Sequence, residues 1–176
     1  MERSFGDFNK ELGYKTLDER VVRASAGLML GLALIAFINV NFLQRYFVIT
    51  YISGFLMLNF LIGILLNPKY APTVILANLI VAKQSKLPIG AIQKKFAWTL
   101  GLLLASAIFI LSLLLLNDVR FFEPVCLLCL ICIALLFIES SFGICVGCNL
   151  YHFFVKIKWI KEPAIKPNCM GDSCEV

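Results

Sequence analysis

Four stretches of this chain are apolar for long enough to cross a lipid bilayer, and this constrains the fold more than any other feature. They cover about residues 24–43, 46–66, 96–116 and 121–151. A helix needs about 20 apolar residues to span the hydrocarbon core. The composition agrees, since 60% of the residues are hydrophobic and the mean hydropathy is +0.88. We therefore predict an all-α polytopic membrane protein with four transmembrane helices in one bundle.

The whole chain, residues 1–176, is expected to form a single membrane domain. A charged leader over residues 1–23 precedes the first span, and a tail over residues 152–176 follows the last. Residues 72–82 are apolar but too short to span, which predicts a short interfacial or re-entrant helix between the second and third spans. The segment Thr16-Leu17-Asp18-Glu19 matches a capping box, which predicts a helix start with Thr16 as N-cap.

The positive charges are distributed unevenly along the chain. All but two of the sixteen Lys and Arg residues lie in the leader, in the loop between the second and third spans (residues 67–95), or in the tail. The exceptions, Arg45 and Arg120, lie in the other two loops. Because Lys and Arg concentrate in cytoplasmic loops, we predict that both termini are cytoplasmic. Topology thus accounts for the net charge of +5, and we expect membrane lipid and no nucleic acid as a partner.

Two Cys-x-x-Cys pairs stand near the ends of the last apolar segment. The first pair is Cys126 and Cys129, and the second pair is Cys145 and Cys148. A continuous helix from Cys126 to Cys148 would rise about 33 Å, close to the bilayer core of about 30 Å. In the predicted topology the first pair faces the outside, where disulfides persist, and the second faces the cytoplasm, where thiols stay reduced.

Cysteines three positions apart on a helix lie on one face. Such a pair can cycle between dithiol and disulfide, carry a persulfide, or bind a soft metal. The alternative is that each cysteine only fills space as a small apolar residue. A functional role is favoured for the second pair, because the flanking Gly143 and Gly147 allow a close approach of a partner. Both readings stay open for the first pair, and packing is preferred for Cys132.

Glu139 and His152 are the other unusual residues near the second pair. A carboxylate inside an apolar span is costly, so Glu139 should face the bundle and accept a proton from a nearby thiol, unless it lies closer to the headgroups. Because Glu139 and Cys145 are six positions apart, a bend over residues 140–143 is needed to bring them together. Cys145, Cys148 and His152 would supply three metal ligands. An interfacial anchor is the favoured role of His152, and no metal is predicted.

Several segments resemble a bacterial membrane family known as domain of unknown function 4395. The matching pieces, over about residues 16 to 151, are Asp18-Glu19-Arg20-Val21-Val22-Arg23 with Gly27, Lys69-Tyr70-Ala71-Pro72, Lys94-Lys95-Phe96-Ala97, and Glu139 with Phe142-Gly143-Ile144-Cys145-Val146-Gly147-Cys148-Asn149-Leu150-Tyr151. The resemblance implies a small polytopic membrane protein, often encoded beside thioredoxin-like or rhodanese-like proteins, with no established reaction. It singles out Glu139, Cys145 and Cys148.

A second likeness is local. The segment Glu123-Pro124-Val125-Cys126-Leu127-Leu128-Cys129 looks like the opening of the active helix in quinone-linked disulfide oxidases of the vitamin K epoxide reductase and bacterial disulfide-bond-formation type. This likeness implies a four-helix bundle and makes a quinone the candidate cofactor. Those oxidases carry a second outer cysteine pair that passes oxidation to substrate, and the outer loops here have none.

Taken together, these features predict a thiol-based carrier of electrons or sulfur in a bacterial cytoplasmic (inner) membrane. Its soluble partner would be a thioredoxin-like or rhodanese-like protein. The predicted site residues are Cys145, Cys148, Glu139, Cys126 and Cys129. The alternative, from another class, is a non-catalytic membrane subunit or a small-solute permease whose cysteines only pack. The terminal cysteines, Cys169 and Cys174, are expected in a disordered tail.

Overall fold

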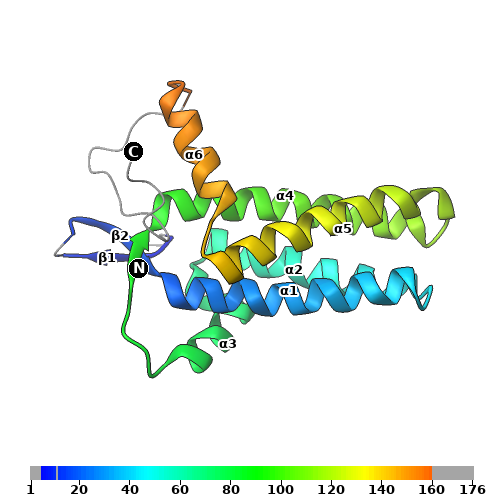
Figure 1. Cartoon of the computed structure of the whole chain (residues 1–176), viewed down its shortest axis with the longest axis horizontal. Helices are drawn as coiled ribbons and strands as arrows, with labels where there is room; N and C mark the ends of the chain where they lie inside the picture. The colour runs from blue at the N-terminus through cyan, green and yellow to red at the C-terminus, as the bar shows by residue number, and fades with distance from the viewer. Residues whose placement is uncertain (1–4, 11, 160–176) are drawn as a thin grey trace.

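Four long helices form one bundle in the computed structural model, which describes residues 5–10 and 12–159 (Figure 1). They are α1 (Glu19–Asn41), α2 (Tyr46–Leu65), α4 (Ala91–Leu115) and α5 (Phe122–Phe137). The first three, and the segment Val119–Phe142 that contains α5, are each long and apolar enough to cross a membrane. Helices suit this setting because they satisfy their backbone hydrogen bonds internally. The predicted polytopic all-α fold is confirmed.

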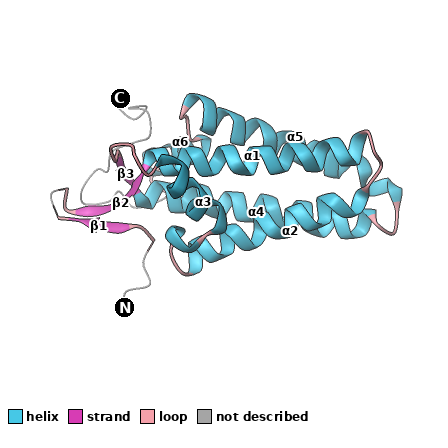
Figure 2. Cartoon of the chain, turned by 90° about the horizontal axis from the view of Figure 1, so that it is seen from below, coloured by secondary structure: helices cyan, strands magenta, loops and turns pink. Residues whose placement is uncertain are grey.

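A small antiparallel sheet at one end of the bundle was not predicted. Its strands are β1 (Asp7–Asn9), β2 (Tyr14–Asp18) and β3 (Pro88–Gly90), with β2 in the middle. Figure 2 shows the sheet beyond the ends of the helices. We call this end of the bundle the sheet end, and the end that carries the turns 42–45 and 116–121 the far end. The sheet ties the leader to the chain just before α4.

The start of α1 differs from the predicted capping box. Thr16 lies in the middle of β2, opposite Asp7 on one side and Gly90 on the other. Its backbone is therefore committed to the sheet, and Asp18 caps the helix instead. The Asp18 carboxylate accepts a hydrogen bond from the Arg20 N–H at 3.1 Å, which satisfies one of the free donors at the helix start.

The short apolar helix predicted between the second and third spans is α3 (Pro72–Val81), preceded by a 3-10 turn over Pro68–Tyr70. A buried polar network fastens it to the bundle. The Asn59 side chain accepts hydrogen bonds from the backbone N–H and the hydroxyl of Thr73, both at 3.0 Å. The Thr73 hydroxyl also lies 2.8 Å from the Ser25 hydroxyl. Asn59 thus faces other helices rather than lipid.

The third span begins earlier than predicted. Gly90 ends β3 and is at the same time the N-cap of α4, so the chain turns directly from strand to helix. Lys94 and Lys95, which were assigned to a basic loop, therefore lie in the first turns of α4. The Lys94 side chain is completely buried.

The predicted continuous segment over residues 121–151 is wrong. After α5 the chain forms a π-helical turn (Ile138–Phe142), reverses at Gly143 with a φ of 70°, and starts a separate helix, α6 (Val146–Lys156). Figure 1 shows α6 leaving the bundle at a steep angle to α5. The first and second cysteine pairs are therefore not on one helix, and the rise of about 33 Å does not apply. Cys169 and Cys174 lie outside the described residues.

Candidate functional site

The second cysteine pair occupies the start of α6. Cys145 is the N-cap of this helix, and its Sγ accepts a hydrogen bond from the backbone N–H of Cys148 at 3.3 Å. Both side chains are buried, with 2% and 6% of their surface exposed. Helix N-termini favour negative charge, and a cysteine in this position is more readily a thiolate. The local backbone alone therefore favours an ionised Cys145.

Lys94 connects this thiol to Glu139. Its ammonium group forms an ion pair with the Glu139 carboxylate and donates to Cys145 Sγ over 3.6 Å. A fully buried lysine requires negative partners, because an unpaired charge in the interior is very costly. The carboxylate and the sulfur are those partners. The predicted residues Glu139, Cys145 and Cys148 thus come together, and Lys94 is the residue between them.

The break between α5 and α6 makes this arrangement possible. Glu139 lies in the π-helical turn, and Gly143 has a left-handed conformation. Residues six apart on a regular helix do not share a face, so the reversal at Gly143 is what brings Cys145 back toward Lys94. The bend predicted over residues 140–143 is therefore present. π-Helical turns of this kind are frequent at functional sites.

Gly147 sets the distance between α6 and α4. A Cβ atom at Gly147 would lie 2.6 Å from the Cβ of Ala97, closer than two carbon atoms can approach. A glycine is therefore required for α6 to rest on α4 at this point. The close partner that the flanking glycines predicted is, for Gly147, a helix of the same chain.

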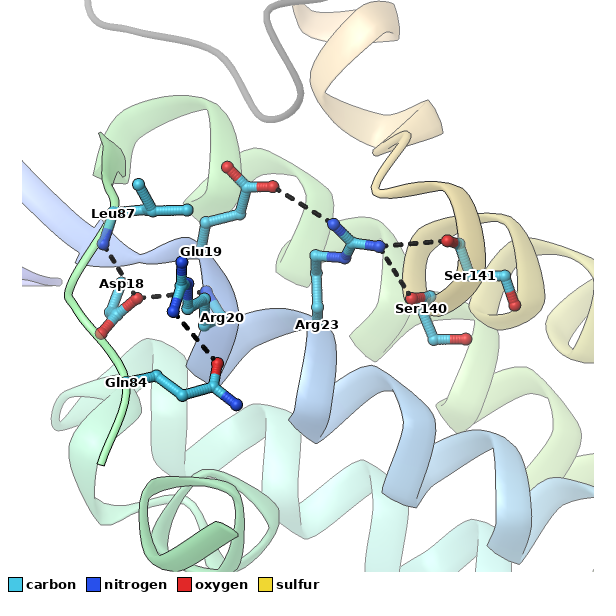
Figure 3. Close-up of polar contacts among 8 residues, drawn as sticks. All are labelled: Asp18, Glu19, Arg20, Arg23, Gln84, Leu87, Ser140 and Ser141. Atoms are coloured by element: carbon cyan, nitrogen blue, oxygen red, sulfur yellow. Dashed lines mark hydrogen bonds and ion pairs between the residues drawn. The ribbon is translucent and has the colours of Figure 1, made fainter. Parts of the chain in front are cut away.

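Arg23 of α1 holds the π-helical turn in place. Figure 3 shows its guanidinium between the Glu19 carboxylate and the turn. Its Nη2 donates to the backbone oxygen of Ser141 at 3.0 Å and to that of Ser140 at 3.4 Å, and its Nη1 lies 3.7 Å from Glu19. The planar guanidinium can serve several acceptors at once. Arg23 thus stabilises the segment that carries Glu139.

The two thiols of the second pair differ in acidity. The hydrogen bond from the Cys148 side chain lowers the pKa of Cys145, and the positive charge of Lys94 lowers it further, against the effect of burial. The same hydrogen bond, followed by burial, raises the pKa of Cys148. Cys145 is therefore suited to attack a sulfur atom, and Cys148 is suited to act second.

The structure does not assemble the metal set of Cys145, Cys148 and His152. The Nε2 of His152 lies 2.9 Å from Nε2 of Gln93, and burial lowers the pKa of its imidazole. Within residues 5–10 and 12–159, no three His, Cys, Asp or Glu side chains are grouped so that they could hold a metal ion. His152 instead helps to join α6 to α4.

The first pair lies toward the far end and is not part of this site. Cys129 is buried in an apolar cluster with Val125, Ile108 and Leu115. The Cys126 thiol donates to Asn41 Oδ1 over 3.7 Å. No lysine or carboxylate contact corresponding to that of Cys145 is recorded for these two thiols in the described part of the chain. The redox role predicted for the first pair stays a prediction.

Lys94 and Arg23 are the site residues that sequence reasoning missed. A signal for Lys94 was present, because Ala91, Lys94, Trp98 and Gly101 share one face if the helical period is extended upstream of residue 96. Trp98 is buried on that face. Arg23 gave no such signal, since its acceptors are backbone oxygens more than a hundred residues away.

Comparison with known proteins places the chain in a family. No curated protein and no solved structure matches it, and the local likeness of residues 123–129 to disulfide oxidases stays a prediction. A family model matches residues 17–156, a range that includes Arg23, Lys94, Glu139 and the second cysteine pair. The chain therefore belongs to the family described as domain of unknown function (DUF4395).

Proposed function

We propose that this protein is an integral membrane carrier of electrons or sulfur that works through Cys145 and Cys148, with a soluble thioredoxin-like or rhodanese-like protein as partner. The observation that carries the proposal is the buried Lys94, which contacts both Glu139 and Cys145. A cation beside Cys145 favours the thiolate, which is the form that attacks sulfur. Cysteines that only fill space need no such partner.

Two related reactions fit this dithiol. With a disulfide donor, the Cys145 thiolate attacks one sulfur, a mixed disulfide forms and the other donor sulfur leaves as a thiolate. Cys148 then loses its proton and attacks Cys145 Sγ, which forms the Cys145–Cys148 disulfide and releases the second donor thiolate. With a persulfide donor, Cys145 attacks the outer sulfur, becomes a persulfide itself and releases the donor thiolate.

The Lys94–Glu139 pair manages charge and protons in both reactions. Lys94 stabilises the Cys145 thiolate before attack. We assign the proton that leaves Cys148 to Glu139, with Lys94 as the relay, because the Lys94 ammonium group contacts both the Glu139 carboxylate and Cys145, the partner of Cys148. Since Cys145 is almost completely buried, a protein donor requires α6 to move away from α4, whereas a small persulfide requires less opening.

The membrane and orientation belong to the same proposal. The sheet end carries most of the positive charge, and the turns at the far end carry Arg45 and Arg120. If the buried Lys94 is left out of the count of positive charges, the sheet end still carries most of them. The positive-inside rule therefore supports a cytoplasmic sheet end in a bacterial inner membrane. In that orientation the second pair is next to soluble cytoplasmic thiol proteins.

Trapping of the first adduct tests the proposal. We expect Cys148→Ser, treated with glutathione persulfide or oxidised glutathione, to accumulate an adduct mapped to Cys145 by peptide mass spectrometry, because the second thiol is absent. Cys145→Ser should form none on Cys148. Cys132→Ser, which changes a thiol outside the site, should behave like the unmodified protein. Equal labelling of Cys145→Ser and Cys148→Ser, or no labelling of either, would favour the alternative of packing cysteines in a non-catalytic subunit or permease.

A further inference from the structure

A cavity of about 220 Å³ lies beside the candidate site, between α4, α5 and α6. Its walls are almost entirely apolar. Among the described residues that line it, Glu139 is the only charged one. Nothing in the proposed thiol chemistry uses this space.

The cavity opens at the surface of the bundle. Three of its lining side chains, Leu135, Val146 and Leu150, have between 36% and 41% of their surface exposed. Leu135 belongs to a membrane span, and α4 on the other side of the cavity belongs to another. The opening between α5 and α6 is therefore directed toward lipid, and α6 lines one end of the cavity through Val146, Gly147 and Leu150.

The polarity of the cavity changes with depth. Glu139 and Gly147 line its end near α6, whereas Cys132 and Leu104 line its deeper part. From Glu139 to Cys132 the helix descends about 10 Å. A ligand that fits has a polar end near the membrane surface and an apolar end inside the bilayer. This is the orientation of a lipid.

We propose that this cavity binds one acyl chain of a membrane phospholipid, with the polar head beside Glu139 and the start of α6. An apolar cavity of about 150 Å³ already accommodates a benzene molecule and stays dry, so the space suffices for part of a hydrocarbon chain. The bound chain would exclude water next to the Lys94–Glu139 ion pair, which strengthens its electrostatic interactions. The proposal rests on the membrane fold and is independent of the thiol function.

Trp98 provides a probe, because it lines the cavity and only 3% of its surface is exposed. The chain has two tryptophans, so Trp159→Phe leaves Trp98 as the only one. We expect phosphatidylcholine with brominated acyl chains, in vesicles that contain this variant, to quench Trp98 fluorescence despite its burial. Contact with a bromine atom is what quenches an indole, so the signal reports a chain inside the cavity.

Matched variants show whether the quenching chain occupies the cavity. Leu104→Phe narrows its deep part and should abolish most of the quenching, whereas Leu103→Phe changes a neighbour with 63% of its surface exposed that does not line the cavity. Leu135→Phe at the opening, with Ile131→Phe as its control, repeats the comparison if Leu104→Phe does not fold.

Absence of quenching, or equal quenching in each variant and its control, would overturn the proposal. If a lipophilic ring compound quenches Trp98 fluorescence and brominated lipid does not, the proposal is also overturned. The cavity would then bind a free apolar ligand and not an acyl chain of the membrane. Neither result affects the trapping of an adduct on Cys145, so this proposal and the thiol function fail separately.

Discussion

Lys94 is a fully buried lysine. A positive charge in the protein interior is costly unless negative groups lie beside it. The two negative partners of Lys94 are unequal, since the Glu139 carboxylate forms an ion pair with it, whereas Cys145 is a negative partner only when it is ionised. The ammonium group therefore links the ionisation of the thiol to the stability of the ion pair. Any change at Glu139 alters both quantities, and the two effects can be measured separately.

The Glu139→Gln variant gives a prediction with a definite sign. The negative charge of Glu139 raises the pKa of Cys145, opposing Lys94. Its removal leaves Cys145 as the main counter-ion of Lys94, so the pKa of Cys145 should fall further and the thiolate should persist to lower pH. The rate of Cys145 alkylation, followed from acid to neutral pH, should then rise earlier than in the unmodified protein. An unchanged or later rise would mean that Glu139 takes the thiol proton directly, as the sequence first suggested.

Lys94→Met separates the chemical role of the ion pair from its structural role. The variant leaves Glu139 without its partner, which typically costs about 3–5 kcal/mol for a buried pair, and it removes the cation that favours the Cys145 thiolate. The double variant Lys94→Met/Glu139→Gln removes both charges and should recover most of the thermal stability. Alkylation of Cys145 at neutral pH should be slower in both variants than in the unmodified protein. Rapid alkylation in the double variant would show that Lys94 does not activate Cys145.

At the scale of secondary-structure elements, α1 holds the π-helical turn, whereas α6 rests on α4. Arg23 supplies the contacts, through the carbonyls of Ser140 and Ser141. Arg23→Ala removes these hydrogen bonds and should destabilise the protein by about 1 kcal/mol. Because the turn carries Glu139, the pH profile of Cys145 alkylation should shift as well.

Arg20→Ala is the matched control for Arg23→Ala. Arg20 lies one turn away on α1. Its side chain donates a hydrogen bond to Gln84 on the connection between α3 and β3, an exposed contact away from the π-helical turn (Figure 3). Its loss should leave the alkylation profile unchanged. If both variants shift the pH profile of Cys145 alkylation equally, the effect arises from the net charge at this end of the bundle and not from the hydrogen bonds between Arg23 and the π-helical turn.

The sequence predicted the spans because their signal is local, whereas the site depends on contacts between distant segments. Apolar runs of sufficient length identify helices without knowledge of their neighbours. Glu139, Cys145 and Cys148 were also found, since a carboxylate in a span and a Cys-x-x-Cys pair are unusual in themselves. Lys94 was assigned to a loop, because a charged residue next to Lys95 and a proline-containing turn resembles a span boundary. Only the strand β3, whose pairing with β2 is non-local, places the helix start at Ala91.

At the scale of the whole molecule, the two ends of the bundle differ. The sheet end holds the strands, the thiol site and the contacts of Arg23 with the π-helical turn. The polar end of the cavity and most of the positive charge lie there too. The far end has short turns and the first cysteine pair. A thiol carrier with a soluble partner requires its reactive end on the side where that partner resides, so the orientation of the bundle decides which class of partner is accessible.

Reporter fusions test this orientation. We expect a fusion in the turn after Gln44 to be active as alkaline phosphatase, which requires export, and a fusion at Lys86 to be fluorescent as a cytoplasmic reporter, because positive loops are retained inside. The first pair then faces the oxidising side, and mass-tag alkylation should find Cys126 and Cys129 more oxidised than Cys145 and Cys148. Phosphatase activity at Lys86 would reverse the compartments. The Lys94-activated Cys145 would then meet exported donors, and a cytoplasmic thioredoxin-like or rhodanese-like partner would be excluded.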